Sequence, residues 1–554
     1  MADYYQWERW SWDEERDLAA YKGWACDPKD TVRTRSLFDL WMCLDVYCDY
    51  DGYATEWLQV PTSRGPDWRL KDGWLYVTVN VVPEEERPKR EVEFRKRIAP
   101  WIEDFEHEYR KETDELEKQA ERFKALYPDR KELNAGELKR AFEDWIYFYR
   151  ITAHYHFRWM YIFCMISKMF NDLCSELTGI DRYHPLFNDV MGGFTHKVLQ
   201  TDAEMWRVSK MAVEMGLAPI FESTRDNREV LRKISQQGKN GKIWLDELNK
   251  VTQIYGWRTS RNWDVSSPSW IEDPSLTFEP IRVFLKEPLF APDKVRHDQV
   301  MARQKAEKEL ISRIPETRRD LFGKLLKGAQ WANIVQEEHP FYTEQIGNSV
   351  GRFITKEIGE RWSREGAVDD PGDIYYLLPD EIYIRIVPGS KFSPKKIVKI
   401  RRQQHEEFRK AEPQMFLGDQ NAFYEVMKYD PLMMSVVSPA PRERPELKAD
   451  LYGTVAAPGV AEGIARVALT TEEAEEFKSG EILVTVETNV QWNPLFSIAA
   501  GVVTDGGGVL SHASIVGRQY GIPVISGTLE GTRKIKTGMR IRIDGNLGTV
   551  YILD

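Results

Sequence analysis

The chain has 554 residues, of which 42% are hydrophobic and 30% are charged, and its formal net charge is −11. This length predicts several domains with sizeable cores, and the composition is that of a globular protein. The acidic balance argues against nucleic acid or an anionic membrane as a partner, because either one requires a basic surface.

Residues 1–90 are predicted to form an irregular N-terminal region that packs on the domain after it. Trp, Pro and Gly are scattered through it, and "GWLYVTVNVV" (Gly73–Val82) alternates like a strand. The first twenty residues lack the basic and apolar segments of a signal peptide. The five cysteines have no CxxC spacing. We therefore expect a cytoplasmic protein without disulfides or structural zinc.

Residues 91–434 predict a mainly helical domain, with long charged segments whose apolar residues recur at helical spacing. The most apolar stretch, Trp145–Phe170, has the length of a membrane span. Because it contains two arginines, two histidines and a lysine, we expect a buried helix instead. His154 and His156 lie two residues apart and point to different sides of a helix, so they cannot share a metal. No metal ligand is predicted in the chain.

The sequence changes character at residues 435–450, where three prolines and mixed charge predict a semi-stiff linker. Short apolar runs punctuated by glycine follow, among them "GEILVTVE", "AAGVVTD" and "RIRIDGNLGTVYIL". They predict strands, and residues 451–554 are expected to form a small separate α/β domain. The expected fold class is multidomain, with a mainly α-helical domain followed by this C-terminal α/β domain.

Within that last domain, "TDGGGVLSHASIVGRQYGIP" (Thr504–Pro523) combines a glycine turn with a histidine. The three glycines Gly506, Gly507 and Gly508 allow a tight turn with positive φ after a buried strand. "SHASIVGRQY" has a helix-compatible composition, which places His512 in the first turn of a helix. The free N–H groups and the dipole of that turn favour a bound anion. A phosphate carried on His512 would lie in this field.

Two other interpretations of His512 were weighed. A helix-start histidine without chemistry is the simpler one, and the surrounding strands and residues disfavour it. The neighbouring Ser511 raises the possibility of a serine hydrolase. Residues one apart do not face each other on a helix, and Ser511 does not lie in a GxSxG motif.

This segment closely resembles the phosphohistidine signature of the swivelling domain in phosphoenolpyruvate synthase, pyruvate phosphate dikinase and their relatives. The resemblance covers roughly the last hundred residues and implies a β/β/α-type swivelling domain. It implies that His512 accepts a phosphoryl group at one site and delivers it at another. Thr504 and Arg518 would steady the phosphate, together with Gly506, Gly507, Gly508 and Ser511.

No stretch resembles the family's ATP-grasp region, and no P-loop motif GxxxxGK[ST] is present. The chain given ends at Asp554, directly after the swivelling domain, where dikinases continue into a phosphoenolpyruvate barrel. We therefore expect an ATP-grasp subunit in trans, holding most of the ATP and Mg²⁺. Neither phosphoenolpyruvate nor pyruvate is expected as the second substrate.

The middle region has a looser resemblance to the helical acceptor domain of phenylphosphate synthases and rifampin phosphotransferases. It rests on segments such as "FNDVMGGFTHKVLQTDAEMWRVSKMA", "YGWRTSRNWDVSSPSWIEDPS" and "QEEHPFYTEQ". The order of domains is most similar to the histidine-bearing subunit of phenylphosphate synthase. That similarity implies transfer from ATP, through His512, to an aromatic hydroxyl such as phenol. Phosphorylation of another alcohol or antibiotic, and a phosphocarrier or regulatory protein without an acceptor, remain alternatives.

An acceptor hydroxyl needs a base, because phenol has a pKa near that of tyrosine, about 10. The candidates are His339 as the base, Glu338 as an orienting carboxylate and Arg258 as a charge clamp. Each has a structural alternative, since Arg258 could cap a helix and Glu338 could form an ion pair inside the bundle.

Overall fold

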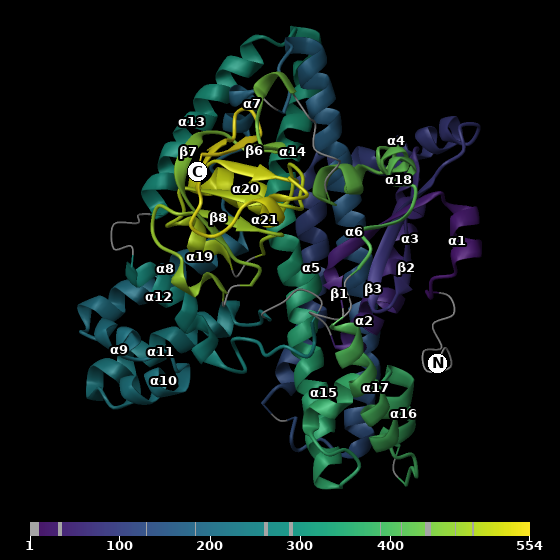
Figure 1. Cartoon of the computed structure of the whole chain (residues 1–554), viewed down its shortest axis with the longest axis vertical. Helices are drawn as coiled ribbons and strands as arrows, with labels where there is room; N and C mark the ends of the chain where they lie inside the picture. Colours follow the sequence, from purple (N-terminus) through teal and green to yellow (C-terminus); the bar gives the residue numbers. More distant parts are fainter. Residues whose placement is uncertain are drawn as a thin grey trace.

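The structure is a computed structural model. It has a helical region followed by a C-terminal sheet domain, so the predicted fold class is confirmed (Figure 1). Residues 438–444 of the predicted linker lie outside the described part of the chain. The described residues are 10–31, 36–128, 130–182, 184–259, 264–286, 292–387, 389–410, 413–437, 445–470, 473–489 and 492–553.

The described residues of the N-terminal region form regular strands and helices, so its description as irregular is wrong. It contains an antiparallel four-stranded sheet in the order β2-β3-β1-β4, and β4 comes from far along the chain. The sequence does not predict β1, because "GWACDPKDT" is rich in residues that are uncommon in strands. Pairing with β3 on one side and β4 on the other stabilises it as a strand. The strands are β1 (Gly23–Thr31), β2 (Ser63–Lys71), β3 (Trp74–Val81) and β4 (Phe416–Gly418), and the helices are α1 (Glu14–Ala20), α2 (Leu37–Trp41), the π-helix η2 (Met42–Cys48) and α3 (Asp49–Leu58).

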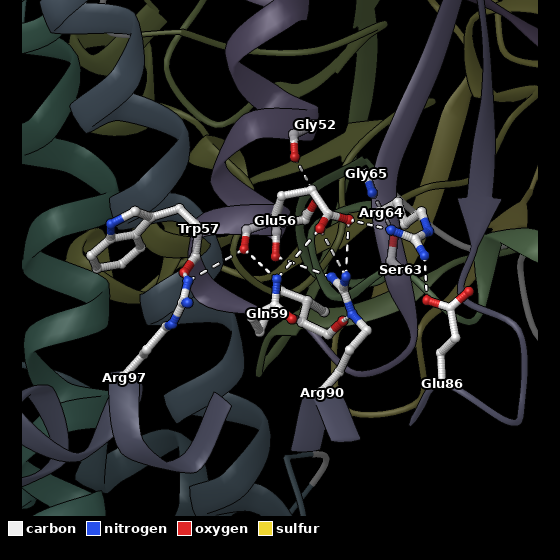
Figure 2. A network of polar contacts seen from close by, with 12 residues as sticks. Gly52, Glu56, Trp57, Gln59, Ser63, Arg64, Gly65, Glu86, Arg90 and Arg97 are labelled. Atoms are coloured by element: carbon white, nitrogen blue, oxygen red, sulfur yellow. Dashed lines mark hydrogen bonds and ion pairs between the residues drawn. The ribbon is translucent and has the colours of Figure 1, made fainter. Parts of the chain in front are cut away.

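A polar network fastens this N-terminal region to the first long helix, α4 (Arg87–Glu103) (Figure 2). The buried Arg90 of α4 donates to both carboxylate oxygens of Glu56 at 2.9 Å and to the Val60 carbonyl at 2.8 Å. Arg64 of β2 donates to the same Glu56 carboxylate at 2.9 Å and also pairs with Glu86. Because a planar guanidinium makes several fixed bonds at once, Arg90 sets how α3 lies against α4.

The central helices share one large hydrophobic core. The charged segment after residue 90 forms two helices: Pro100 lies near the end of α4, and Asp104 caps the next helix, α5 (Phe105–Leu126). The apolar stretch Trp145–Phe170 lies inside the 44-residue helix α6 (Ala135–Thr178), whose side chains are buried on most sides. Among the helices of the described ranges, none combines the length and apolar character that crossing a bilayer demands.

Other helices surround this core or extend it. Those of residues 197–286 form a lobe with its own hydrophobic cluster around Trp244, Phe221 and Phe278. The helices are α7 (Pro185–Val190), α8 (Lys197–Glu214), α9 (Ala218–Ser223), α10 (Asn227–Ser235), α11 (Gly238–Tyr255), α12 (Phe278–Lys286), α13 (Pro292–Ser312), α14 (Arg319–Pro340), the π-helix η5 (Phe341–Gln345), α15 (Ile346–Arg364), α16 (Pro379–Ile386), α17 (Lys395–Phe408), α18 (Gln420–Met427) and the π-helix η7 (Met433–Val437), with 3-10 turns at Pro274–Thr277, Glu316–Arg318 and Pro371–Tyr376.

The C-terminal domain is an eight-stranded mixed sheet in the order β5-β12-β11-β7-β8-β9-β10-β6. Its four central strands, β7 to β10, run parallel, and apolar clusters fill both faces. In Figure 1 this yellow domain lies against α13 and α14, which contact its helix α20. The elements are β5 (Leu451–Tyr452), β6 (Thr454–Ala457), β7 (Val460–Val467), β8 (Ile482–Thr485), α19 (Asn493–Phe496), β9 (Gly501–Thr504), α20 (His512–Tyr520), β10 (Val524–Ser526), α21 (Gly531–Lys534), β11 (Arg540–Asp544) and β12 (Thr549–Ile552), with 3-10 turns at Pro445–Leu447 and Glu473–Glu476.

Candidate active site

His512 is the first residue of α20 and follows the glycine turn that leaves β9. Gly507 has a φ of 97°, and a Cβ there would lie 2.7 Å from Ser511 Oγ, so this turn requires glycine. Thr504 Oγ1 donates to the Gly506 carbonyl at 2.7 Å and closes the turn from its other end. The predicted glycine turn and the first-turn position of His512 are both confirmed.

The serine beside His512 is held within its own helix turn. Ser511 Oγ lies 2.9 Å from Ser514 Oγ, which donates to the Gly508 carbonyl at 2.6 Å. No side chain caps α20, so the N–H groups of its first turn have no capping side-chain acceptor in the place that a bound anion would take. This arrangement fits support of a phosphate and gives Ser511 no base partner.

The imidazole of His512 is clamped between the two parts of the molecule. Its Nδ1 lies 2.7 Å from Glu337 Oε2 of α14, and its Nε2 lies 2.7 Å from Asn493 Oδ1 of α19. An oxygen that can accept a hydrogen bond thus lies 2.7 Å from each ring nitrogen of His512. The side chain of His512 is 14% exposed, so in this arrangement the helical region covers it.

Glu337 is the buried carboxylate of this contact, and it is charged there. Burial opposes ionisation, yet the pKa of Glu337 lies below its ordinary value because its charge interaction and hydrogen bond with His512 favour the carboxylate. Glu337 therefore fixes the ring of His512 through Nδ1, as a buried carboxylate orients a catalytic histidine.

A second chain of polar contacts supports the Nε2 side. Asn493 Nδ2 donates to Asp202 Oδ2 of α8 at 3.0 Å, and the hydroxyl of Tyr520 donates to the same oxygen at 3.1 Å. Burial raises the pKa of Asp202 to about 6, although both donors stabilise its charged form. Asp202 thus ties α19 and α20 of the C-terminal domain to the helical region.

Next to these carboxylates lie two buried side chains without hydrogen-bond partners among the described residues. They are Arg258 and His196. Within the described ranges, no hydrogen bond is made by the three guanidinium nitrogens of Arg258 or by the two ring nitrogens of His196. Burial lowers the pKa of Arg258 to about 10 and that of His196 to about 4, so Arg258 is a cation and His196 is neutral near pH 7. The Arg258 guanidinium lies 5.2 Å from the centre of the Phe341 ring. Unsatisfied buried donors are costly, and they fit an anionic group that would bind there.

Arg518, predicted to bind phosphate, is engaged with protein in this arrangement. It donates to the carbonyls of Ala456 (2.6 Å) and Val509 (2.9 Å) and to Asn333 Oδ1 of α14 (3.3 Å). Burial lowers the pKa of Arg518 to about 10. Arg518 here holds the base of the turn and touches the helical region, and its role toward phosphate stays a prediction.

The three residues predicted for the acceptor side do not lie together. Arg258 lies near Asp202 and Glu337, whose charges influence its pKa. Glu338 instead pairs with Arg110 of α5 at 3.0 Å. His339 donates from Nδ1 to the Val335 carbonyl (2.7 Å), and its ring lies 4.6 Å from that of His156. Glu338 therefore does not orient His339, and its neighbour Glu337 contacts His512.

Sequence reasoning missed Glu337, Asn493, His196 and Asp202, although three of them lie in segments that it singled out. Glu337 stands next to Glu338, and His196 and Asp202 lie in the "FTHKVLQTD" run. His196 and Asp202 lie six residues apart, at and just after the start of α8. This spacing in the sequence could have indicated two polar groups close together near one end of a helix. Asn493 had no comparable signal, because its role depends on docking of α19 against α8.

Two known protein-family models match this chain, one on each side of the contact between Glu337 and His512. Residues 156–337 match the model of the rifampicin phosphotransferase fourth domain, and residues 477–548 match that of the PEP-utilising enzyme mobile domain. The C-terminal sheet domain is therefore a mobile domain of the PEP-utilising enzyme family, preceded by a rifampicin phosphotransferase-type region. The contact between Glu337 and His512 joins the two matched regions.

Several curated proteins are similar over longer or shorter stretches. An uncharacterized phosphotransferase, YvkC, of Bacillus subtilis is 25% identical over 427 residues, which are 76% of this chain and 50% of that protein. A rifampicin phosphotransferase of Streptomyces sviceus is 28% identical over 61% of this chain and 39% of its own. A phosphoenolpyruvate synthase of Aeropyrum pernix is 45% identical over 108 residues, 19% of this chain and 13% of its own. The chain spans half or less of the length of these relatives.

Proposed function

We propose that this chain is part of an ATP-dependent phosphotransferase in which His512 carries the phosphoryl group to a hydroxyl acceptor. The observation that supports this most is the 2.7 Å contact between His512 and the buried Glu337, beside the unpartnered Arg258 and His196. A carrier histidine that meets a buried carboxylate and a spare cation lies where an anionic group can be handed over.

Glu337 would act through the nitrogen that does not carry phosphate. With phosphate on Nε2, in place of the contact to Asn493, the ring keeps its Nδ1 hydrogen bonded to Glu337. When the Nε2–P bond breaks and the acceptor O–P bond forms, the ring then leaves as neutral imidazole and not as an anion. A neutral leaving group lowers the barrier to transfer.

The acceptor hydroxyl loses its proton in the same step. Our candidate base is His196, which is neutral near pH 7 and has no hydrogen-bond partner among the described residues. The candidate predicted from the sequence, His339, instead has its ring 4.6 Å from that of His156. Arg258 would hold the phosphoryl oxygens as they approach the acceptor.

An aromatic hydroxyl such as phenol is the proposed acceptor, giving an aryl phosphate. Phe341 lies beneath Arg258, and Lys197 stands 5.7 Å from the Phe341 ring and 5.8 Å from that of Tyr342. This aromatic and cationic lining suits a planar ring with an ionisable oxygen. The domain order resembles that of phenylphosphate synthase, which supports the same acceptor class.

The match of residues 156–337 to a rifampicin phosphotransferase domain favours a second candidate, a larger alcohol of the rifamycin type. In either case we propose that an ATP-grasp partner, with Mg²⁺, splits ATP to AMP and phosphate and charges His512 with the β-phosphoryl group. A carrier or regulatory protein without an acceptor is the third possibility.

The two half-reactions are tested separately. Potassium phosphoramidate, a small-molecule donor to histidine, charges the purified chain without a partner, and mass spectrometry locates the phosphate. We expect acid-labile phosphate on His512 and none in His512→Ala, with His107→Ala, an exposed histidine, as the matched control. Phosphate on the His512→Ala chain equal to that on wild type would refute the carrier role.

The charged protein is then offered phenol, a rifamycin and buffer alone. Aryl phosphate supports the first acceptor, phosphorylated rifamycin the second, and stable label with both points to the third possibility. The partner is tested with β-labelled ATP and an ATP-grasp protein: label should reach His512 only when both chains and Mg²⁺ are present.

A further inference from the structure

Three buried side chains outside the His512 contact meet in the helical core. His156 comes from α6, His339 from the end of α14 and Glu344 from η5, and one ligand atom of each lies within 4.8 Å of the others. His156 Nδ1 lies 3.3 Å from Glu344 Oε1. Two imidazoles and one carboxylate form a donor set typical of divalent transition metals.

The backbone brings His339 and Glu344 to the same side. In a regular α-helix, residues five apart point about 140° away from each other. Here Pro340 precedes the π-helical turn η5, in which the Ile346 N–H bonds to the Phe341 carbonyl, five residues back. Such a turn places residues five apart one above the other, and π-turns within helices recur at functional sites.

The tautomer of His339 is fixed for binding. Its Nδ1 donates to the Val335 carbonyl at 2.7 Å, and its Nε2 is buried without a hydrogen-bond partner among the described residues. Histidines that bind metals usually donate their other ring nitrogen to such a carbonyl. Burial lowers the pKa of His339 to about 4 and that of His156 well below its ordinary value, so both rings are neutral, as metal ligands must be.

The spacing also suits a metal. Ligand bonds of about 2.0–2.1 Å in tetrahedral geometry place two ligand atoms roughly 3.3 Å apart. The distance between His156 Nδ1 and Glu344 Oε1 has this value. Three protein ligands leave one position open, as in catalytic zinc sites.

We propose that His156, His339 and Glu344 form a binding site for a divalent transition metal of the Zn²⁺ type, with one coordination position open. The sequence predicts no metal ligand, because His154 and His156 cannot share an ion. The structure pairs His156 with residues from another helix instead. His339 lies two residues from Glu337 along α14. An ion bound at this site would therefore place its charge close to the carboxylate that contacts His512. The site itself does not depend on the proposed phosphoryl transfer.

The test uses Co²⁺ and Zn²⁺ on the full chain, after dialysis against a chelator. We expect saturable uptake of one Co²⁺ per chain, with the visible bands of a tetrahedral ion, and displacement of Co²⁺ by Zn²⁺. His339→Gln and Glu344→Gln should each weaken the affinity by more than about 100-fold, because loss of an outer-shell partner alone costs about 10- to 100-fold. The control His154→Gln, on the same helix two residues from His156, should bind as wild type does.

Wild-type protein that shows neither saturable uptake nor the Co²⁺ bands overturns the proposal, and so does equal uptake by wild type and both variants. Circular dichroism of each variant shows whether it is folded. If the variants do not fold, wild type alone decides, because Zn²⁺ bound only by the folded chain must raise its Tm with concentration.

Discussion

The two sides of the His512 contact are built differently. On the C-terminal side, the residues from Thr504 to Ser514 form one continuous segment that bonds to its own side chains and backbone, and α19 adds Asn493. The helical side is assembled from α8, α14 and the segment after α11, and its buried Arg258 and His196 have no hydrogen-bond partner within the described ranges. The difference teaches that the carrier side is complete by itself, whereas the acceptor side has polar groups that a ligand would satisfy.

Among the substitutions that test this difference, Arg258→Met should change the rate of phosphoryl transfer most. Loss of this cation should slow transfer from phosphorylated His512 to an acceptor by about 10²–10³-fold, as when an oxyanion donor is lost. The same change removes buried donors that lack hydrogen-bond partners among the described residues, so the free energy of unfolding without ligand should rise by about 1–3 kcal/mol. Single-turnover rates and urea unfolding measure the two effects.

Charging of His512 by phosphoramidate is the internal control for this variant, since it requires only the carrier side. An Arg258→Met chain that transfers as fast as wild type would show that Arg258 is a packing residue. Loss of charging and transfer together would show a general disruption.

Glu337→Gln tests the carboxylate that joins the two sides. An amide cannot stabilise the charged ring through Nδ1, so transfer should fall by about 100-fold. Glu338→Gln is the matched control one residue along α14, where the carboxylate pairs with Arg110. If Glu338→Gln lowered transfer more than Glu337→Gln does, the orientation of α14 described above would be wrong.

These two neighbours also show where prediction from sequence ends. The glycine turn and the helix beginning at His512 follow from residues adjacent in the chain, and both are present as expected. Glu337 and Glu338 point about 100° apart on the same helix. Choosing between them requires knowledge of which face meets the C-terminal domain, and that depends on docking of segments 175 residues apart.

The same limit applies to the fold. The strand Trp74–Val81 is correctly predicted because its alternation is local. β1 is not, because its partner β4 lies almost four hundred residues further along and its composition does not favour a strand. The π-helical turn that groups His339 with Glu344 also leaves no pattern in hydrophobic periodicity.

Asp202, on the helical side, should make the free energy of unfolding depend on pH. Its pKa is raised to about 6 in the folded chain from an ordinary 3.8, so the folded state binds more protons between these values. The free energy of unfolding should therefore fall as pH rises from about 4 to 6, by up to about 3 kcal/mol. Asp202→Asn should flatten that part of the stability curve, measured by urea unfolding across pH. An unchanged curve would mean that Asp202 is charged throughout.

The smallest expected effect is on the carrier side. Gly507→Ala places a Cβ 2.7 Å from Ser511 Oγ at a φ of 97°, which should cost about 1–3 kcal/mol of unfolding free energy. Gly323→Ala on α14 is the matched control, because its Cβ would meet nothing within 4 Å. That change should stabilise the helix by about 0.5–1 kcal/mol. Equal effects of the two substitutions on Tm would contradict the strained turn.

The most direct test of the central claim is the rate at which phosphorylated His512 loses its phosphate as the concentration of phenol rises. If His512 delivers to a hydroxyl bound beside Glu337 and Arg258, the rate should rise and saturate, with one aryl phosphate formed per phosphohistidine lost. A rate that does not depend on phenol or on any other hydroxyl compound, with inorganic phosphate as the sole product, would contradict it.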